Sequence, residues 1–74
     1  MCYLIAKKYS EPGCIAVETE SGKALAGLVS YLGHRMIDKG VQILTLNDPE
    51  MYGEYRPYHF VESEKAFIDK VLSI

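Results

Sequence analysis

Residues 25–36, LAGLVSYLGHRM, decide the fold of this 74-residue chain. The apolar side chains recur with the spacing of one helix face, at positions i, i+3, i+4, i+7 and i+11: Leu25, Leu28, Val29, Leu32 and Met36. A hydroxyl of Ser21 or Thr19 is expected to cap the start, and Gly40 suits the left-handed residue that ends a helix. We therefore predict an amphipathic helix that lies on a β-sheet.

The segments on both sides of this helix have the composition of strands. Residues 2–9 and 14–19 are expected to form an antiparallel hairpin around Glu11-Pro12-Gly13-Cys14, which is typical of a type II turn. The first strand is apolar on both faces near its start, which indicates a central position. Residues 41–46 read as a buried strand, and the helical crossover predicts that this third strand runs parallel to the second.

The spacing of the apolar residues becomes irregular after residue 46. Residues 51–58 are predicted to form a loop with a helical turn after Pro49, and residues 58–61 a short edge strand. A second helix is expected from near Ser63 to the chain end. The prediction is an α+β two-layer sandwich, in which two helices cover a small mixed sheet of three to four strands. The element order is ββαβ(β)α, in one domain over residues 1–74.

Composition indicates a marginal core and excludes several classes of protein. The chain is 49% hydrophobic and 24% charged, with net charge -2. At this size about 62% of the surface is buried on folding, and about 4,600 Å² stays exposed, which favours a partner subunit. The scattered charges argue against nucleic-acid binding. Neither a signal-like start nor an apolar run of 18 residues is present, so we expect a cytoplasmic protein without a membrane contact.

Two cysteines, Cys2 and Cys14, are predicted to stay reduced. Folding the hairpin about its turn places Cys14 opposite Glu11 and leaves Cys2 near the open end. Six or more residues at about 3.3 Å each then separate the thiols along the ribbon. That distance excludes a disulfide within the hairpin and favours a reducing compartment.

Cys2 is the candidate nucleophile of the sequence. If Met1 is removed, Cys2 carries a thiol together with an α-amine that can serve as its base. Met-Cys before a hydrophobic strand resembles the start of the N-terminal-nucleophile amidohydrolases, although Tyr3 stands where glutamine amidotransferases carry Gly. A Cys2-dependent hydrolase or ligand-binding enzyme is therefore an alternative. We favour the interpretation of Cys2 as a small apolar strand residue.

Residues 52–60, YGEYRPYHF, hold four of the eight aromatic side chains. An extended, polyproline-like conformation would place three phenols on one side with two basic groups between them, which defines a candidate binding set of Tyr52, Tyr55, Arg56, Tyr58 and His59. Such a platform would stack bases of single-stranded nucleic acid or line a peptide groove. The favoured alternative is that these rings close the core of a chain without Trp.

Metal and cofactor sites are not predicted. The carboxyl ends of the two parallel strands carry four polar residues, interpreted as solvated turn residues rather than cation ligands: Glu18, Glu20, Asn47 and Asp48. Four potential zinc ligands lack paired short spacings: Cys2, Cys14, His34 and His59. His34 near the end of the first helix has no assigned role.

The chain resembles a small family of bacterial proteins of unknown function that begin Met-Cys-Tyr-Leu-Ile-Ala and carry Tyr-Gly-Glu-Tyr and Pro-Tyr elements, here at residues 52–55 and 57–58. The resemblance implies no activity. Open sheet edges and a small core favour a non-enzymatic, homo-oligomeric interaction module, with a homodimer as the expected partner arrangement. Gly27 and Gly33 would permit close approach of another backbone.

Overall fold

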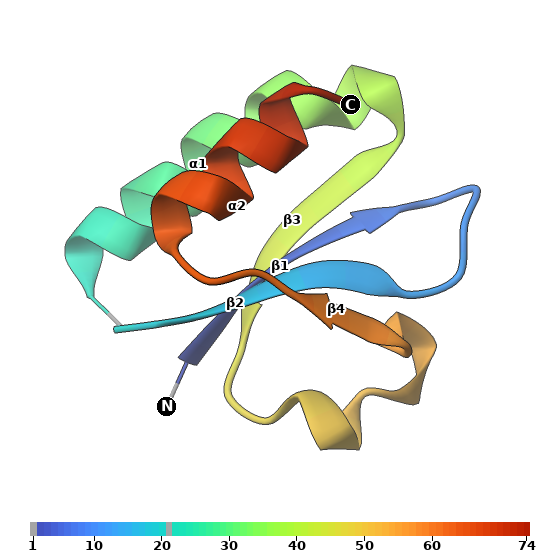
Figure 1. The fold of residues 1–74 in the computed structure, drawn as a ribbon. Coiled ribbons are helices and arrows are strands. Elements are labelled where there is room, and N and C mark those ends of the chain that lie inside the picture. The colour runs from blue at the N-terminus through green and yellow to red at the C-terminus, as the bar shows by residue number, and fades with distance from the viewer. Residues whose placement is uncertain (1, 21) are drawn as a thin grey trace.

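The protein, described at residues 2–20 and 22–74 by a computed structural model, has a four-stranded sheet with two helices. The sheet order is β3-β1-β2-β4 (Figure 1). The elements are β1 (Cys2–Lys8), β2 (Cys14–Thr19), α1 (Lys23–Met36), β3 (Val41–Leu46), β4 (Tyr58–Phe60) and α2 (Glu64–Leu72). This arrangement confirms the predicted α+β class and element order, including the strand at residues 58–60.

Strand β1 lies in the middle and determines the directions of its neighbours. It pairs antiparallel with β2 and with β3, and β2 pairs parallel with β4. Because β2 and β3 are both antiparallel to β1, they run parallel to each other, as predicted. They are not neighbours, however, since β1 lies between them.

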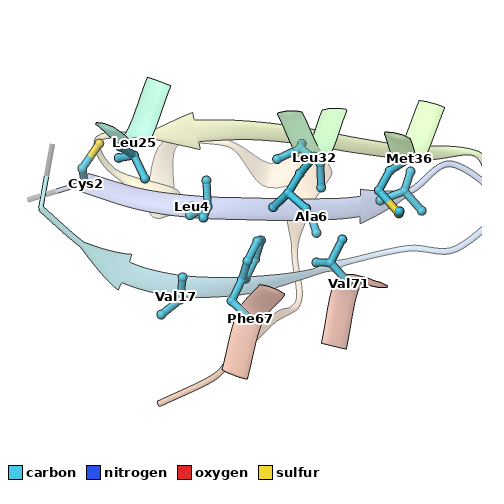
Figure 2. Close-up of a cluster of buried hydrophobic side chains, with 11 residues drawn as sticks. Cys2, Leu4, Ala6, Val17, Leu25, Leu32, Met36, Phe67 and Val71 are labelled. Carbon is cyan, nitrogen blue, oxygen red and sulfur yellow. The ribbon is translucent and has the colours of Figure 1, made fainter. Parts of the chain in front are cut away.

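Both helices cover the same face of the sheet (Figure 1). Helix α1 packs on β3 and α2 packs on β2, and between them lies the larger core cluster. Figure 2 shows that α1 contributes Leu25, Leu32 and Met36 to this cluster, whereas α2 contributes Phe67 and Val71. The apolar stripe that defined the first helix therefore faces the sheet, as the sequence predicts.

The opposite face of the sheet has a smaller core. Its buried members come from all three long strands and from the loop before β4: Ile5, Cys14, Ala16, Leu46 and Tyr55. In Figure 1 the segment between β3 and β4 lies on this side, away from the helices. The molecule exposes 4813 Å², close to the about 4,600 Å² expected for its mass. The protein thus has a second, smaller core, although the total surface area that it buries on folding stays modest.

The hairpin turn is longer than the sequence suggests. Gly13 has a φ of 81°, as a type II turn requires. The register Ala6↔Ile15 nevertheless places Cys14 across from Lys7 and not from Glu11. The reason is that Tyr9 donates its N–H to the oxygen of Gly40 at 2.7 Å, so the end of β1 follows β3 instead of turning at once into β2. Both thiols remain free, in agreement with the prediction.

The ends of α1 are only partly as predicted. Gly40 takes the left-handed conformation, with a φ of 73°, after a 3-10 turn at Ile37–Lys39. At the start, the N-cap is Gly22 without a side-chain hydrogen bond, and Thr19 belongs to β2. The proposed Thr19 cap is therefore wrong, because the strand continues through that residue. Ser21, the other candidate, lies outside the described residues.

Gly27 in α1 has no packing partner inside the protein, because a Cβ atom added there would find nothing within 4 Å. We predict that Gly27→Ala raises the free energy of unfolding by about 0.5 to 1 kcal/mol, since alanine loses less backbone entropy in a helix. Urea denaturation followed by circular dichroism measures this change. A loss of stability would contradict this prediction, and it would show that Gly27 takes part in a packing contact that is not present within the single chain.

Candidate functional site

The tyrosine-rich segment, residues 52–60, is not extended. Residues 49–51 and 53–55 form two 3-10 turns, and only Tyr58–Phe60 is a strand. This fold separates the phenols, because Tyr52 is 43% exposed whereas Tyr55 is 7% exposed and belongs to the smaller core. The extended conformation that would place three phenols on one side is therefore not the one observed, since the turns rotate Tyr55 toward the sheet; the favoured alternative, that these rings close the core, agrees with the burial of Tyr55.

Hydrogen bonds hold this segment against itself and against β3. The Tyr58 hydroxyl donates to the carbonyl oxygens of Pro49 and, at 3.1 Å, of Tyr52. The Tyr55 hydroxyl donates to Oε1 of Gln42 at 3.4 Å. Arg56 donates from Nη2 to the oxygen of Glu50 at 2.7 Å. The Tyr58 phenol and the Arg56 guanidinium thus satisfy main-chain oxygens of the loop, and the Tyr55 phenol connects the loop to β3.

The exposed part of this segment is smaller than the sequence suggested. Phe60 is 54% exposed and meets Tyr3 edge-on at 5.9 Å and Tyr58 at 5.9 Å in a stacked arrangement. His59 is exposed but points to the helix side, because neighbouring residues of a strand alternate between faces. Of the five predicted binding residues, three are exposed, Tyr58 is half-buried and Tyr55 is buried; the exposed ones are Tyr52, Arg56 and His59.

Replacing a buried ring should test which role the segment has. We predict that Tyr55→Ala lowers the free energy of unfolding by about 3 kcal/mol, because it leaves a cavity in the smaller core. Tyr52→Ala, the matched change at an exposed ring, should cost less than about 1 kcal/mol. Thermal and urea denaturation of both variants provide the comparison. A Tyr55→Ala protein of unchanged stability would return Tyr55 to the list of binding residues.

Cys2 lies in the larger core beneath α1. Its side chain is beside Leu25 in Figure 2, and the residue is 8% exposed. The Sγ–H group points toward Oδ1 of Asn47 at 3.9 Å, a weak contact for a thiol. A nucleophile must reach a substrate carbonyl, and this burial favours the interpretation of Cys2 as a small apolar residue. The suggested removal of Met1 concerns a residue outside those described.

Cys14 lies on the other face, in the smaller core. Burial raises the pKa of its thiol to about 11, and the positive charge of Lys7 offsets only part of that effect. The thiolate is the reactive form of cysteine, so Cys14 is a poor nucleophile at neutral pH. Burial also raises the pKa of the nearby Tyr55 and Tyr58 phenols.

These raised pKa values predict a loss of stability in alkali. Between pH 9, where an unfolded thiol ionises, and about 11, the folded protein keeps the Cys14 proton that the unfolded chain releases. The free energy of unfolding should therefore fall with rising pH, by at most about 1.4 kcal/mol per pH unit from this group. Urea denaturation at pH 8, 9.5 and 10.5 measures the slope. Cys14→Ala should reduce it, and an unchanged slope in that variant would contradict the assignment.

The polar residues at the ends of β2 and β3 meet at one end of the sheet, on either side of the start of β1. Asp48 is used locally, since its Oδ1 accepts the N–H of Glu50 at 3.0 Å and caps the first 3-10 turn. Glu18 and Glu20 are exposed. Within residues 2–20 and 22–74, no group of three or more His, Cys, Asp and Glu side chains is placed to hold a metal ion.

The outer edge of β3 is an open feature of the fold. In the described part of the chain, β3 pairs only with β1, so its other side has no strand partner. Two hollows of about 630 and 420 Å³ lie along this edge between β3 and α1. They share Val29 and Ser30 and include Gly33, Ile43 and Thr45. Together they form one groove, which we call the edge groove.

Sequence reasoning did not single out the edge groove, because it depends on strand order. A helix followed by a strand is compatible with a central or an edge position for that strand. Only the pairing of β1 with both β2 and β3 shows that β3 lies outside. The absence of charged residues and of Pro from residues 41–46 was the available signal, yet it reads equally well as burial. In the same part of the chain, no helix is long and apolar enough to cross a membrane.

Comparison with known proteins gives a match over the whole chain. Residues 1–74 match the model of a family of unknown function (DUF6718). No curated protein matches the chain.

Proposed function

The chain belongs to this family of unknown function, and from its fold we propose that it acts as a homodimeric interaction module that assembles through the β3 edge. The observation that carries the proposal is the unpaired side of β3, which lacks the features that protect edge strands. Residues 41–46, VQILTL, hold neither a charged side chain nor a Pro. Such an edge is a template for another strand, and a second copy of the same chain supplies one.

The hydrogen-bond pattern defines which backbone groups point outward. Tyr9 and Gly40 are a hydrogen-bonded pair, and alternate pairs along an antiparallel ladder share that geometry. The C=O group of Gly40 and both backbone groups of Gln42 and Leu44 therefore point to β1, whereas the N–H of Gly40 donates to the oxygen of Ile37. The outward-pointing N–H and C=O groups, on the side of the edge groove, are those of Val41, Ile43 and Thr45.

These outward groups are complementary to themselves under a twofold axis. If two β3 strands pair antiparallel about Ile43, that residue faces its own copy and Val41 faces Thr45 of the second copy. Each facing pair exchanges two hydrogen bonds. All six outward donors and acceptors of each strand edge would then be satisfied. A pairing centred on Gln42 or on Leu44 would also place the matching faces of the two sheets on the same side. It would, however, leave one outward-pointing residue of each β3 strand without an opposite residue in the partner strand.

Helix α1 offers a second contact beside the strand. Small side chains follow one another along its edge side at Ala26, Ser30 and Gly33. A Cβ atom added at Gly33 would lie 4.0 Å from Cβ of Ile43, so α1 passes close to the proposed axis at a glycine. Paired strands are about 4.8 Å apart, which brings the two α1 helices side by side over the joined sheets. Small residues at the crossing permit that approach.

The helical contact is needed because one strand pair is a small interface. A stable complex buries about 1,200 Å² or more in total, which exceeds the area that six residues of an edge supply. The edge groove adds Val29 and the 61% exposed side chain of Ile37 to the contact. The two free thiols further support a cytoplasmic setting for this assembly, since disulfides are rare in reducing compartments.

The two other function classes receive less support from the side chains. A Cys2-dependent enzyme needs an accessible thiol, and Cys2 is buried. Single-stranded nucleic acid needs stacked rings on one side with free cations, and the buried Tyr55 interrupts that surface. The dimer therefore remains the function that the geometry supports best.

A proline in the outer edge should weaken the dimer. Thr45→Pro removes only an N–H that points away from β1, so the β1–β3 ladder stays intact. Two symmetry-related hydrogen bonds are lost, and we expect the dimer dissociation constant to rise tenfold or more. Sedimentation velocity from about 1 to 300 µM measures it, with Thr45→Ser as the matched control that keeps the N–H. A wild-type protein that stays monomeric throughout would overturn the proposal.

A second pair of variants tests where the twofold axis of the proposed dimer lies. Gly33→Lys puts a charged side chain at the proposed helix crossing, whereas Gly27→Lys adds the same residue to α1 on the solvent side. Helix propensity favours lysine over glycine at both positions, and the added Cβ at Gly33 meets Ile43 at an ordinary contact distance of 4.0 Å. Urea denaturation checks that both variants stay folded. We expect only Gly33→Lys to weaken the dimer. Equal dimerisation of the two variants would show that α1 does not take part.

A further inference from the structure

The ring of Phe60 lies on the outer strand β4, on the sheet face opposite the helices. It is 54% exposed, meets the Tyr3 ring edge-on at 5.9 Å and stacks on Tyr58 with 5.9 Å between the ring centroids. We propose that Phe60, Tyr3 and the carboxylate of Glu18 form a docking surface, the aromatic edge, for an extended peptide segment with an arginine side chain. An exposed ring beside a carboxylate is complementary to a guanidinium, which combines a flat face with a positive charge.

The register of the sheet places Glu18 beside both rings. Cys14 and Ala16 of β2 face the smaller core, so Glu18, two residues further along the strand, points to the same side. Glu18 lies across from Tyr3 of β1, and Phe60 lies across from Ala16. Residues across from each other have Cβ atoms about 4.5 to 5.5 Å apart, and diagonal neighbours are about 7 to 8 Å apart. The Glu18 carboxylate is thus within reach of a cation that rests on either ring.

The exposed carboxylate of Glu18 has no counter-ion in the part of the chain that the structure describes, where the ion pairs lie in the hairpin turn and in α2. Glu20 and Glu62 are also exposed, and they follow parallel strands whose ends meet at one end of the sheet. Lys7 is on the same face as Tyr3 but about 13 Å further along β1, which exceeds the about 10 Å over which exposed charges interact at 0.1 M salt. A cationic partner therefore meets carboxylates that no described side chain pairs with.

The backbone of β4 indicates that the partner segment is extended. The oxygen of Pro57 and the N–H of Val61 bond to β2, at 3.0 and 2.8 Å. Alternate residues of a strand direct their backbone groups to the same side, so the groups of Tyr58 and Phe60 point away from β2. Among the described residues, no strand pairs with β4 on that side. A peptide strand added there places one of its side chains next to the Phe60 ring.

Side chains must supply most of the recognition, because β4 is short. Residues 58–60 offer the outward backbone groups of two residues, and a short edge strand of this kind does not hold a partner by its backbone alone. The exposed ring and the free carboxylate therefore select the peptide, in the way that side-chain contacts give specificity to added strands. The same carboxylates repel the phosphates of a nucleic acid, which favours a peptide over single-stranded nucleic acid on these rings.

Two peptides separate the charge of the partner side chain from its shape: acetyl-Gly-Thr-Val-Arg-Val-Thr-Gly-amide and the same peptide with citrulline in place of arginine. Each is titrated into ¹⁵N-labelled protein, and amide shifts are followed by NMR. We expect shifts centred on Glu18, Tyr58 and Phe60, with the arginine peptide binding about three- to tenfold more tightly than the citrulline peptide. Shifts that are absent or confined to β3 would overturn the site. Equal affinities for the two peptides would overturn the arginine preference.

Glu18→Gln and Phe60→Leu remove the charge and the aromatic face separately, each at an exposed side chain. We expect Glu18→Gln to lose the preference for arginine over citrulline, and Phe60→Leu to bind the arginine peptide about two- to fivefold more weakly. Glu11→Gln, in the hairpin turn at the other end of the sheet, is the matched control and should keep the preference. If both glutamine variants lose it equally, the effect is that of overall charge and the site assignment is wrong. The aromatic edge is distinct from the edge groove, so Thr45→Pro should leave peptide binding unchanged.

Discussion

The pairing of β1 on both of its sides is the interaction on which the rest of this structure depends. Strand β1 lies between β2 and β3, and Leu4 and Ile5 on its two faces are completely buried. Each later element is placed by reference to it: α1 and α2 cover the Leu4 side, and the loop before β4 covers the Ile5 side. A central strand that is apolar on both faces requires two covering layers, even in a chain this short.

The second layer explains the concentration of tyrosines late in the sequence. The chain has no Trp and only two Phe, so the smaller core is closed by Tyr55, with Tyr58 packed against it. Tyrosine suits this position because its ring fills space while its hydroxyl reaches polar atoms at the edge. Here the hydroxyls bond to Gln42 and to loop carbonyls. Within this segment, Tyr55 and Tyr58 therefore serve as a cover of the smaller core.

The same topology leaves one long strand edge unpaired in the described part of the chain. Because β1 lies between β2 and β3, β3 takes an outer position with a row of unpaired backbone groups. Backbone groups in a row suit another strand, and the proposed dimer follows from this open edge.

Local sequence determined the elements and the buried faces of this protein. The helical stripe at residues 25–36, the hairpin with its positive-φ Gly13 and the left-handed Gly40 all depend on neighbouring residues, so spacing alone predicts them. Strand order, the inward rotation of Tyr55 and the edge groove arise only when distant segments meet. Each of these depends on which side of β1 a strand occupies, and that choice is made by the summed packing of both faces rather than by any short pattern. Tertiary structure therefore decided which long strand edge of this protein is open.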